Sequence, residues 1–311
     1  MQLFNFVRAG CIWRPLALLV SLLFGLNSMA PLKLQAESHL ESRATTKSCL
    51  WEVSSSQATV FLLGSVHILK HDTYPVSPAA KKALLQSKVV VLEVDLDEID
   101  SFSSQQLLRE KGSLHGEILE DTISPKALSL VIEKTEELGL SFDQIRSFKP
   151  WLLMVTLTTT KLRKLGFDPI HGVDRYFFDQ AKRRNKEILS LESIEYQLDR
   201  LDGMSTKTQE LVLLQTLEEL DVVGEKFDEI LMAWSKGEVE ALEALLFESF
   251  EDFPVVFQRL ITDRNKNWMP KIQRFLDQTG TTLVVVGAAH LLGPEGVVQL
   301  LKNQGYKVKQ L

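Results

Sequence analysis

Short, strongly apolar runs separated by polar segments predict the strands of a buried sheet. Leu50–Val53 and Thr59–Leu63 flank the polar stretch 54–57, a pattern typical of a β-hairpin. Val89–Val94 and Thr282–Val286 are valine-rich runs of strand length. Short apolar runs bounded by turn-forming residues are typical of strands in the interior of a sheet.

Amphipathic segments between these runs predict βαβ crossovers. Ser77 is a good N-cap and Pro78 a good first helical residue, so a helix is expected over 78–87. That helix would join the strand at 59–63 to the strand at 89–94. The region therefore has the order strand, helix, strand of a crossover unit.

The same order of elements is expected twice more. After the last valine-rich strand, the pattern predicts a helix over 294–303 and a strand over 306–308, with Gly305 suited to end the helix. A weaker copy has a helix over 175–184 and a strand over 187–192. The chain thus contains three quasi-repeated βαβ units.

Between these units the apolar positions recur with the helical period, over about 104–165 and 194–278. The sequence therefore predicts an α/β fold with a mixed central sheet, flanked by helices. A single domain is expected over 49–311, with a mainly helical cap at about 194–278. A separate second domain is the alternative, although no linker marks one.

The first 36 residues differ from the rest. Arg8 and Arg14 precede the apolar run Leu16–Leu26, and Leu34–Ala36 offers small residues at the spacing a signal peptidase accepts. The run is short for a membrane span. We expect a cleaved signal peptide over 1–36, an uncleaved anchor being the alternative, followed by a disordered lead-in at 37–48.

The net charge of the chain limits the classes of binding partner. The 311 residues are 45% hydrophobic and carry a formal charge of −6, and removal of 1–36 leaves 32 basic against 41 acidic residues, hence −9. An acidic, exported protein without a basic stripe is a poor candidate for nucleic-acid binding, and no second apolar segment reaches membrane length. Only Cys49 would remain, so no internal disulfide is expected.

The strongest chemical signal is a repeated strand-end histidine. His67 follows Gly64 after the predicted strand Thr59–Leu63, and His290 follows Gly287 after the strand Thr282–Val286, each in a G-x-x-H arrangement. Glycine lets the chain turn sharply off the sheet, which places each histidine at a carboxyl strand end. Ligands bind at that edge of open α/β sheets, so the two imidazoles suggest a metal site or an acid/base pair.

Four further residues are candidates for the same edge. Glu93 and Glu192 each end a strand in a Leu-Glu pair, where a carboxylate could bind a divalent ion or act as a general base. Asp174 lies in the first turn of its helix, and Arg264 lies in the helix before the last unit. An arginine directed into the crevice could hold a carboxylate or an oxyanion.

Each candidate also has a structural interpretation. A strand-end histidine often only supports the fold, the glutamates could be solvated, Asp174 could merely cap its helix, and Arg264 could belong to a salt-bridged face. His71, Tyr74 and His115 are weaker loop candidates. No G-x-S-x-G elbow, H-E-x-x-H helix or phosphate-binding glycine loop is present.

Taken together, the ordered motifs resemble the TraB/GumN family over essentially all of 49–311. They are Gly64-Ser65-Val66-His67, Leu92-Glu93, Gly172-Val173-Asp174, Leu191-Glu192-Ser193, Arg264-Asn265 and Val286-Gly287-Ala288-Ala289-His290-Leu291 with Gly293 and Gly296. That family is similar to the TIKI metalloproteases, which are associated with manganese- or cobalt-dependent peptide hydrolysis, and is related in fold to the erythromycin esterase-like and ChaN-like proteins. The resemblance implies that His67 and His290 are the paired motif histidines.

The first hypothesis is an exported, periplasmic or extracellular metal-dependent hydrolase acting on peptides or proteins. His67, His290 and Glu93 would hold a divalent ion, and mixed N/O ligation permits Mn, Co or Zn. Glu192 or Asp174 would orient a ligand or take a proton.

Two alternatives remain open. In the first, a histidine acts as general base without a metal and Arg264 anchors an ester substrate. In the second, the protein is a non-catalytic accessory or binding protein of a peptide or polysaccharide pathway. The sequence does not indicate the substrate or the oligomeric state.

Overall fold

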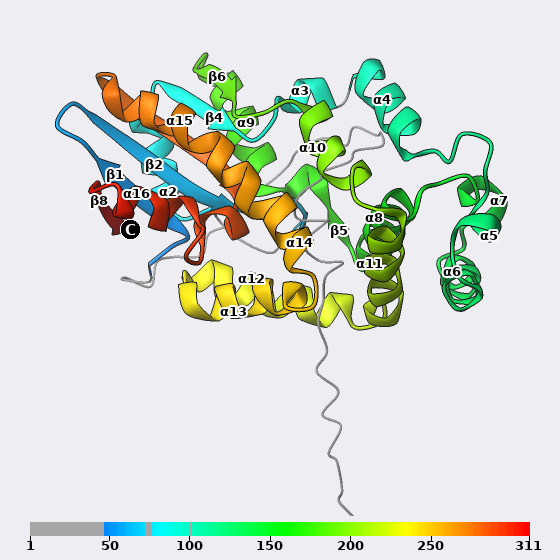
Figure 1. The fold of residues 1–311 in the computed structure, drawn as a ribbon. Helices are drawn as coiled ribbons and strands as arrows, with labels where there is room; N and C mark the ends of the chain where they lie inside the picture. The colour runs from blue at the N-terminus through cyan, green and yellow to red at the C-terminus, as the bar shows by residue number, and fades with distance from the viewer. Residues whose placement is uncertain (1–46, 72–75, 100) are drawn as a thin grey trace, which may run out of the picture.

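The computed structural model describes residues 47–71, 76–99 and 101–311. The expected signal peptide, and all but the last two residues of the expected lead-in, lie outside this part of the chain. A six-stranded mixed sheet lies at the centre with helices packed around it (Figure 1). Its order is β6-β4-β7-β2-β1-β8, with bounds β1 Leu50–Ser54, β2 Ala58–Ser65, β4 Val89–Leu92, β6 Glu187–Ser190, β7 Gly280–Gly287 and β8 Lys307–Gln310.

The sheet combines a parallel half with an antiparallel edge. Strands β2, β7, β4 and β6 are parallel neighbours, with Leu62 opposite Val284 and Val91 opposite Val284 on its other side. Strand β1 pairs antiparallel with β2, which confirms the predicted hairpin. The C-terminal strand β8 pairs antiparallel with β1 at the sheet edge, so the last unit spans the sheet rather than forming a pair of adjacent strands.

Helices connect and cover these strands. In the first half of the chain they are α2 Pro78–Gln86, α3 Leu96–Ile99, α4 Phe102–Gly112, α5 Leu119–Thr122, α6 Pro125–Glu137, α7 Phe142–Ile145, α8 Pro150–Lys164, the short 3₁₀ turn η1 Pro169–His171 and α9 Val173–Arg183. The side chain of Ser77 accepts a hydrogen bond from the Ala80 amide, which confirms the predicted N-cap of α2.

The second half supplies α10 Ile194–Asp202, α11 Thr206–Glu219, α12 Val223–Lys236, α13 Val239–Phe247, η2 Glu248–Phe250, α14 Pro254–Phe257, the π-helical turn η3 Gln258–Thr262, α15 Asp263–Asp277, η4 Ala288–Leu291 and α16 Val297–Asn303. The span expected as a helical cap is thus helical from 194 to 277. Whether it is a unit of its own stays a prediction.

The order of the strands determines which helices share a face. The connections β2-α2-β4 and β4-…-α9-β6 both move across the sheet in one direction, whereas the connection from β6 through α15 to β7 returns in the other. Because parallel crossovers are right-handed, α2 and α9 cover one face and α15 covers the opposite face. Figure 1 shows α15 crossing the sheet over β2.

Several element boundaries differ from the prediction, and three of them lie at the carboxyl edge of the sheet. Strands β4 and β6 end before their glutamates, which lie just past the sheet. Helix α16 begins at Val297 instead of 294, because Gly293 is left-handed with φ 74° and Gly296 is the N-cap. A two-stranded sheet that the sequence did not predict pairs β3 Leu69–Lys70 with β5 Phe167–Asp168, directly after His67.

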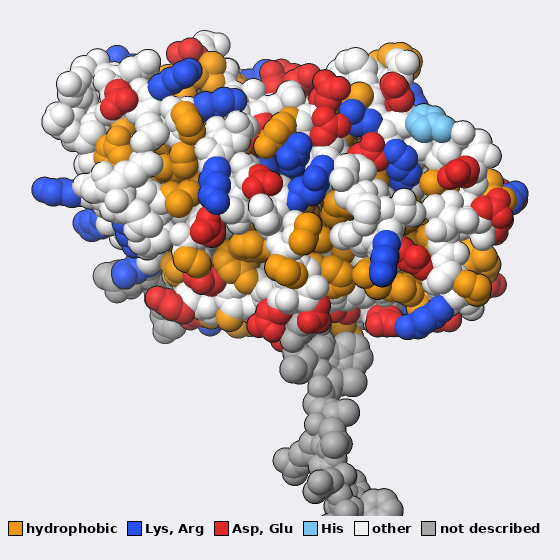
Figure 2. All heavy atoms as spheres, viewed as in Figure 1, with side chains coloured by type: hydrophobic (Ala, Val, Ile, Leu, Met, Phe, Trp, Pro, Cys, Tyr) orange, Lys and Arg blue, Asp and Glu red, His pale blue; other side chains and the backbone are white. Residues whose placement is uncertain are grey.

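The surface carries both signs of charge. Figure 2 shows lysines, arginines and acidic side chains interspersed over one face of the molecule, with apolar side chains between them. Several are paired, for example Lys126 with Glu218 and Lys182 with Asp97. Within residues 47–71, 76–99 and 101–311, no helix combines the length and the apolar character that a membrane crossing requires.

Candidate functional site

The carboxyl ends of the four parallel strands converge on one cluster of polar side chains. His67 follows β2, Glu93 follows β4, Glu192 follows β6 and His290 follows β7. Parallel strands end at the same edge of a sheet, so residues far apart in sequence become neighbours there. The structure therefore brings together both G-x-x-H histidines and both strand-end glutamates.

The small residues of the motifs permit this convergence. A Cβ on Gly64 would lie 3.1 Å from Cα of Ala288, so β2 and the turn after β7 approach closely only because residue 64 is glycine. The Gly287 amide donates to Oε1 of Glu93 at 2.6 Å. The 3₁₀ turn that follows then carries His290 inward.

His67 is held by a carboxylate on one ring nitrogen. Its Nδ1 lies 3.0 Å from Oδ2 of Asp174, in the first turn of α9. Its Nε2 lies 3.7 Å from Oε1 of Glu93, is buried, and has no hydrogen-bond partner among the described residues. A Cβ on Gly287 would lie 3.4 Å from this Nε2 and 3.3 Å from that Oε1, so the glycine leaves space beside both atoms.

Arg264 lies at the centre of the cluster and joins the two glutamates. It enters from α15, two residues after the last residue of the π-helical turn η3. Its Nε and Nη2 donate to Oε1 of Glu192 at 2.9 and 2.6 Å, and Nη2 also donates to Oε2 of Glu93. The guanidinium is 1% exposed, so these ion pairs are almost fully removed from water.

Arg264 also determines the tautomer of His290. Its Nη1 can only donate, so Nε2 of His290, 3.0 Å away, accepts. The proton of His290 is then on Nδ1 and is donated to Oδ1 of Asn265 at 2.7 Å, while Nδ2 of Asn265 donates to the Glu295 carbonyl at 2.8 Å. The network therefore holds His290 neutral, with both nitrogens engaged.

The two histidines titrate in opposite directions. Burial, followed by the charge of Arg264, holds the pKa of His290 well below its usual value. For His67 burial also disfavours the charged form, but the charge and hydrogen bond of Asp174, and then Glu93, outweigh it and raise its pKa to about 10. Burial alone would raise the pKa of Glu93, yet Arg264 and His67 hold it well below the usual range.

The cluster contains two residues that the sequence analysis did not assign to the site. Gln197, in α10, donates to Oε2 of Glu93 at 3.2 Å and to Oε1 of Glu192 at 2.9 Å. Trp268 donates its indole N–H to Oε2 of Glu192 at 2.8 Å. Trp268 lies four residues after Arg264 on the same helix face, a spacing that could have indicated its role.

The weaker sequence candidates lie outside this hydrogen-bond network. His71 packs edge-on against His171, with ring centroids 5.1 Å apart, and His115 lies in an isolated bridge with φ 48°. Tyr74 is not among the described residues.

All members of the cluster are buried, to slightly different extents. His67 and Asp174 are 6% and 8% exposed, whereas His290 and Arg264 are 0% and 1% exposed. The Arg264–His290 pair therefore lies deepest in the cluster, and the His67–Asp174 pair lies slightly nearer the surface, with Nε2 of His67 itself buried.

Within the part of the chain that the structure describes, one pair of donor atoms is placed to hold a cation. Nε2 of His67 and Oε1 of Glu93 are two donors that face each other beside Gly287, and the Asp174–His67 pair has the form in which a carboxylate orients a metal-binding imidazole. The sequence predicted His290 as a metal ligand. In the structure its Nε2 accepts a hydrogen bond from Arg264 and does not face the His67–Glu93 position with a free lone pair. Among the described residues, no three histidine, cysteine or acidic side chains form a ready-made metal cluster.

Known proteins are similar to this chain over most of its length. YbaP of Escherichia coli (strain K12), described as uncharacterized, is 25% identical over 242 residues, which are 78% of this chain and 87% of YbaP. An uncharacterized protein of Treponema pallidum (strain Nichols) is 21% identical over 271 residues, or 82% of this chain and 80% of that protein. Metalloprotease TIKI1 of Xenopus tropicalis is 20% identical over 322 residues, covering 86% of this chain and 62% of TIKI1.

No solved structure matches the chain, so the expected kinship in fold with the erythromycin esterase-like and ChaN-like proteins stays a prediction. The comparison with models of protein families gives a match over almost all of the predicted domain. Residues 49–310, which contain every motif described above, match the model of the TraB/PrgY/gumN family. The chain therefore belongs to the TraB/PrgY/gumN family.

Proposed function

We propose that this protein is a hydrolase of peptide bonds, with its catalytic centre at His67, Glu93 and the Arg264 cluster and with a divalent metal ion as cofactor. The observation that carries the proposal is the unpartnered Nε2 of His67, buried 3.7 Å from a Glu93 oxygen beside the open face of Gly287. A buried nitrogen without a partner is costly unless a ligand completes it.

Charge balance supports a cation at this position. The carboxylates of Glu93, Glu192 and Asp174 are buried and bring three formal negative charges, against one positive charge on Arg264. A proton on His67 would leave the cluster one charge negative, whereas a divalent ion bound to neutral His67 would make it neutral. Uncompensated charge in a buried site is strongly unfavourable, so the cluster favours the divalent ion.

Each side chain then has a definite task. A divalent ion at His67 and Glu93 would supply Lewis acidity, activating water and polarising the scissile carbonyl. Asp174 holds the His67 ring so that Nε2 faces the substrate side. Arg264 donates to both Glu93 and Glu192 and so fixes the Glu93 carboxylate beside the cation position.

His290 supports this arrangement from the interior. Its neutral Nε2 accepts from Arg264, and Asn265 fixes the ring on the other side. His290 could bind the same ion only if Arg264 released this nitrogen. Mn, Co and Zn are all compatible with a nitrogen and carboxylate donor set.

The relatives support the reaction class. The name metalloprotease belongs to TIKI1, whose identity with this chain is 20%. The paired G-x-x-H motifs carry the resemblance, and the structure brings both histidines to one sheet edge. Export is part of the proposal and depends on the leader pattern in residues 1–36.

A hydrolase without a metal is the second candidate. It is favoured by the engagement of His290 and both glutamates by Arg264, which leaves a single histidine with a free nitrogen. However, the pKa of His67, raised to about 10, makes that imidazole an acid and not a base at neutral pH. This version would therefore protonate a leaving group instead of activating water.

The deciding experiment measures metal and activity together. Purified protein is analysed for bound Mn, Co and Zn, and its hydrolysis of a mixed peptide library is followed before and after chelation. We expect about one ion per chain and a loss of cleavage that added metal restores. Cleavage that continues unchanged in metal-free protein would contradict the metal proposal and favour the second candidate.

Asp174→Asn provides a test that requires no substrate. The amide keeps the size of the side chain but removes the charge that orients His67, so we expect metal affinity to fall about 10–100-fold. Isothermal titration with Mn²⁺ or Zn²⁺ measures the change. Asp179→Asn, five residues further along the same helix and paired with Arg175 instead of His67, serves as the control and should bind as the wild type does.

A further inference from the structure

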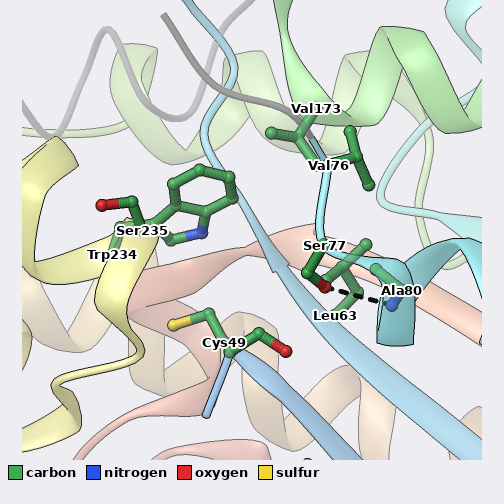
Figure 3. A pocket seen from close by; sticks show the side chains of 9 residues that line it. Cys49, Leu63, Val76, Ser77, Ala80, Val173, Trp234 and Ser235 are labelled. Carbon is green, nitrogen blue, oxygen red and sulfur yellow. Dashed lines mark hydrogen bonds between the residues drawn. The ribbon is translucent and has the colours of Figure 1, made fainter. Parts of the chain in front are cut away.

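A small cavity opens beside the candidate site, on the face of the sheet covered by α2 and α9. It has a volume of about 180 Å³ and is enclosed by segments that are distant in sequence (Figure 3). Its floor is formed by Cys49, just before β1, and by buried side chains of β2, α2, α9 and α12: Leu63, Ala80, Val173 and Trp234.

The chemistry of the cavity changes from floor to rim. The floor is apolar, and even Cys49 behaves as an apolar wall, because burial raises the pKa of its thiol to about 12. The rim is half-buried and carries three hydroxyls, from Ser48, Ser77 and Ser235. An apolar floor under a polar rim suits an apolar side chain whose backbone stays near water.

Two of the cavity walls continue directly into the site. The Val173 amide donates to the Val66 carbonyl at 2.9 Å, and the next residue, Asp174, holds His67. The indole N–H of Trp234 donates to the Gly64 carbonyl at 2.8 Å, three residues before His67. The cavity therefore lies next to the segments that carry His67 and Asp174.

We propose that this cavity binds the apolar side chain, of leucine or phenylalanine size, that flanks the bond cleaved in a peptide substrate. The inference rests on the proposed function and names the substrate class of the same site. Its size is sufficient, since an apolar cavity of about 150 Å³ holds a benzene molecule. We choose a substrate side chain as the occupant because Val173 and Trp234 line the cavity and are hydrogen-bonded to the segment that carries His67.

Binding is tested directly, without any catalytic step. The probe is N-acetyl-leucinamide, with N-acetyl-glycinamide as the comparison, titrated into full-length protein labelled with ¹⁵N. The chain has five tryptophans, and the Trp234 indole resonance is assigned from its loss in Trp234→Phe. We expect the leucine compound alone to shift this resonance in a saturable way.

Filling the cavity provides the matched variants. Ala80→Leu places three more carbons in the cavity and should abolish the shift, whereas Ala79→Leu makes the same change on the same helix outside the cavity lining and should not. If Ala80→Leu does not fold, Ser235→Phe fills the cavity from its half-buried rim. An absent shift in the wild type, or one that persists in a folded filled variant, would overturn the proposal.

Cleavage of the peptide library separates this inference from the proposed function. With the cavity filled, KM for peptides with Leu or Phe beside the cleaved bond should rise about tenfold or more, while peptides with Gly or Ala there are cleaved as before. Cleavage without apolar preference would reject the cavity assignment and leave the hydrolase intact. Saturable probe binding without cleavage of any peptide would contradict the proposed hydrolase activity, while the binding of an apolar side chain in the cavity would stand.

Discussion

Arg264→Met is expected to destabilise the fold by about 3–5 kcal/mol at neutral pH, the usual cost of removing one partner from a buried ion pair. Methionine replaces the length of the side chain but leaves Glu93 and Glu192 buried without their shared cation. Chemical denaturation followed by circular dichroism measures the change in the free energy of unfolding. Arg274→Met, on the exposed face of the same helix, should change it by less than about 0.5 kcal/mol.

The pH dependence of this loss has a definite sign. In the wild type the pKa of Glu93 is held below its unfolded value of about 4.3, so its contribution is complete above that pH and lost as pH falls through the lower, folded-state pKa. Without Arg264, burial favours the protonated acid. The deficit of the variant should therefore shrink between about pH 7 and pH 4, and a constant deficit would contradict this origin.

His67→Ala has the largest expected effect on activity. Under the proposed function it removes the nitrogen donor and leaves Glu93 as the only donor facing the cation position. We expect bound metal to fall from about one ion per chain to near zero, and hydrolysis to fall on the order of 10³-fold. Metal analysis and library cleavage on the same preparation provide both measurements.

Two further variants serve as controls for the His67→Ala result. His171→Ala removes a nearby histidine that packs on His71 and lies outside the cluster, so it should keep both metal and activity. His67→Gln retains a polar side chain for Asp174 and tests whether folding alone explains the loss. A folded His67 variant with full metal content would refute the assignment of His67, and an equal loss in His290→Ala would add His290 as a ligand.

Local signals in the sequence were sufficient for many elements. The hairpin of β1 and β2 follows from two apolar runs around a polar turn, and α2 from a serine cap followed by proline. Strand β7 and the helical span from 194 to 277 follow from valine content and helical period. Such features depend on interactions within a few residues, which a single sequence contains in full.

Boundaries at the site were less predictable. The expected helix at 294 begins only at Val297, because a left-handed Gly293 extends the turn after His290. The pairing of β8 with β1 was also not evident, since strand order depends on contacts between the two ends of the domain, such as the Leu311 amide with the Leu50 carbonyl. Nothing near Tyr306 indicates which edge the last strand will join.

The order of residues is enough to identify the chemical groups and to place them at strand ends: His67, His290, Glu93 and Glu192 follow apolar runs, and a glycine turn directs each histidine off the sheet. How these groups share protons and charge is evident only in the folded chain. Arg264 occupies the centre, His290 accepts its N–H, and His67 alone keeps an open nitrogen. The physical reason is that burial makes each charge depend on its neighbours within a few ångströms, and those neighbours come from six separate segments of the chain.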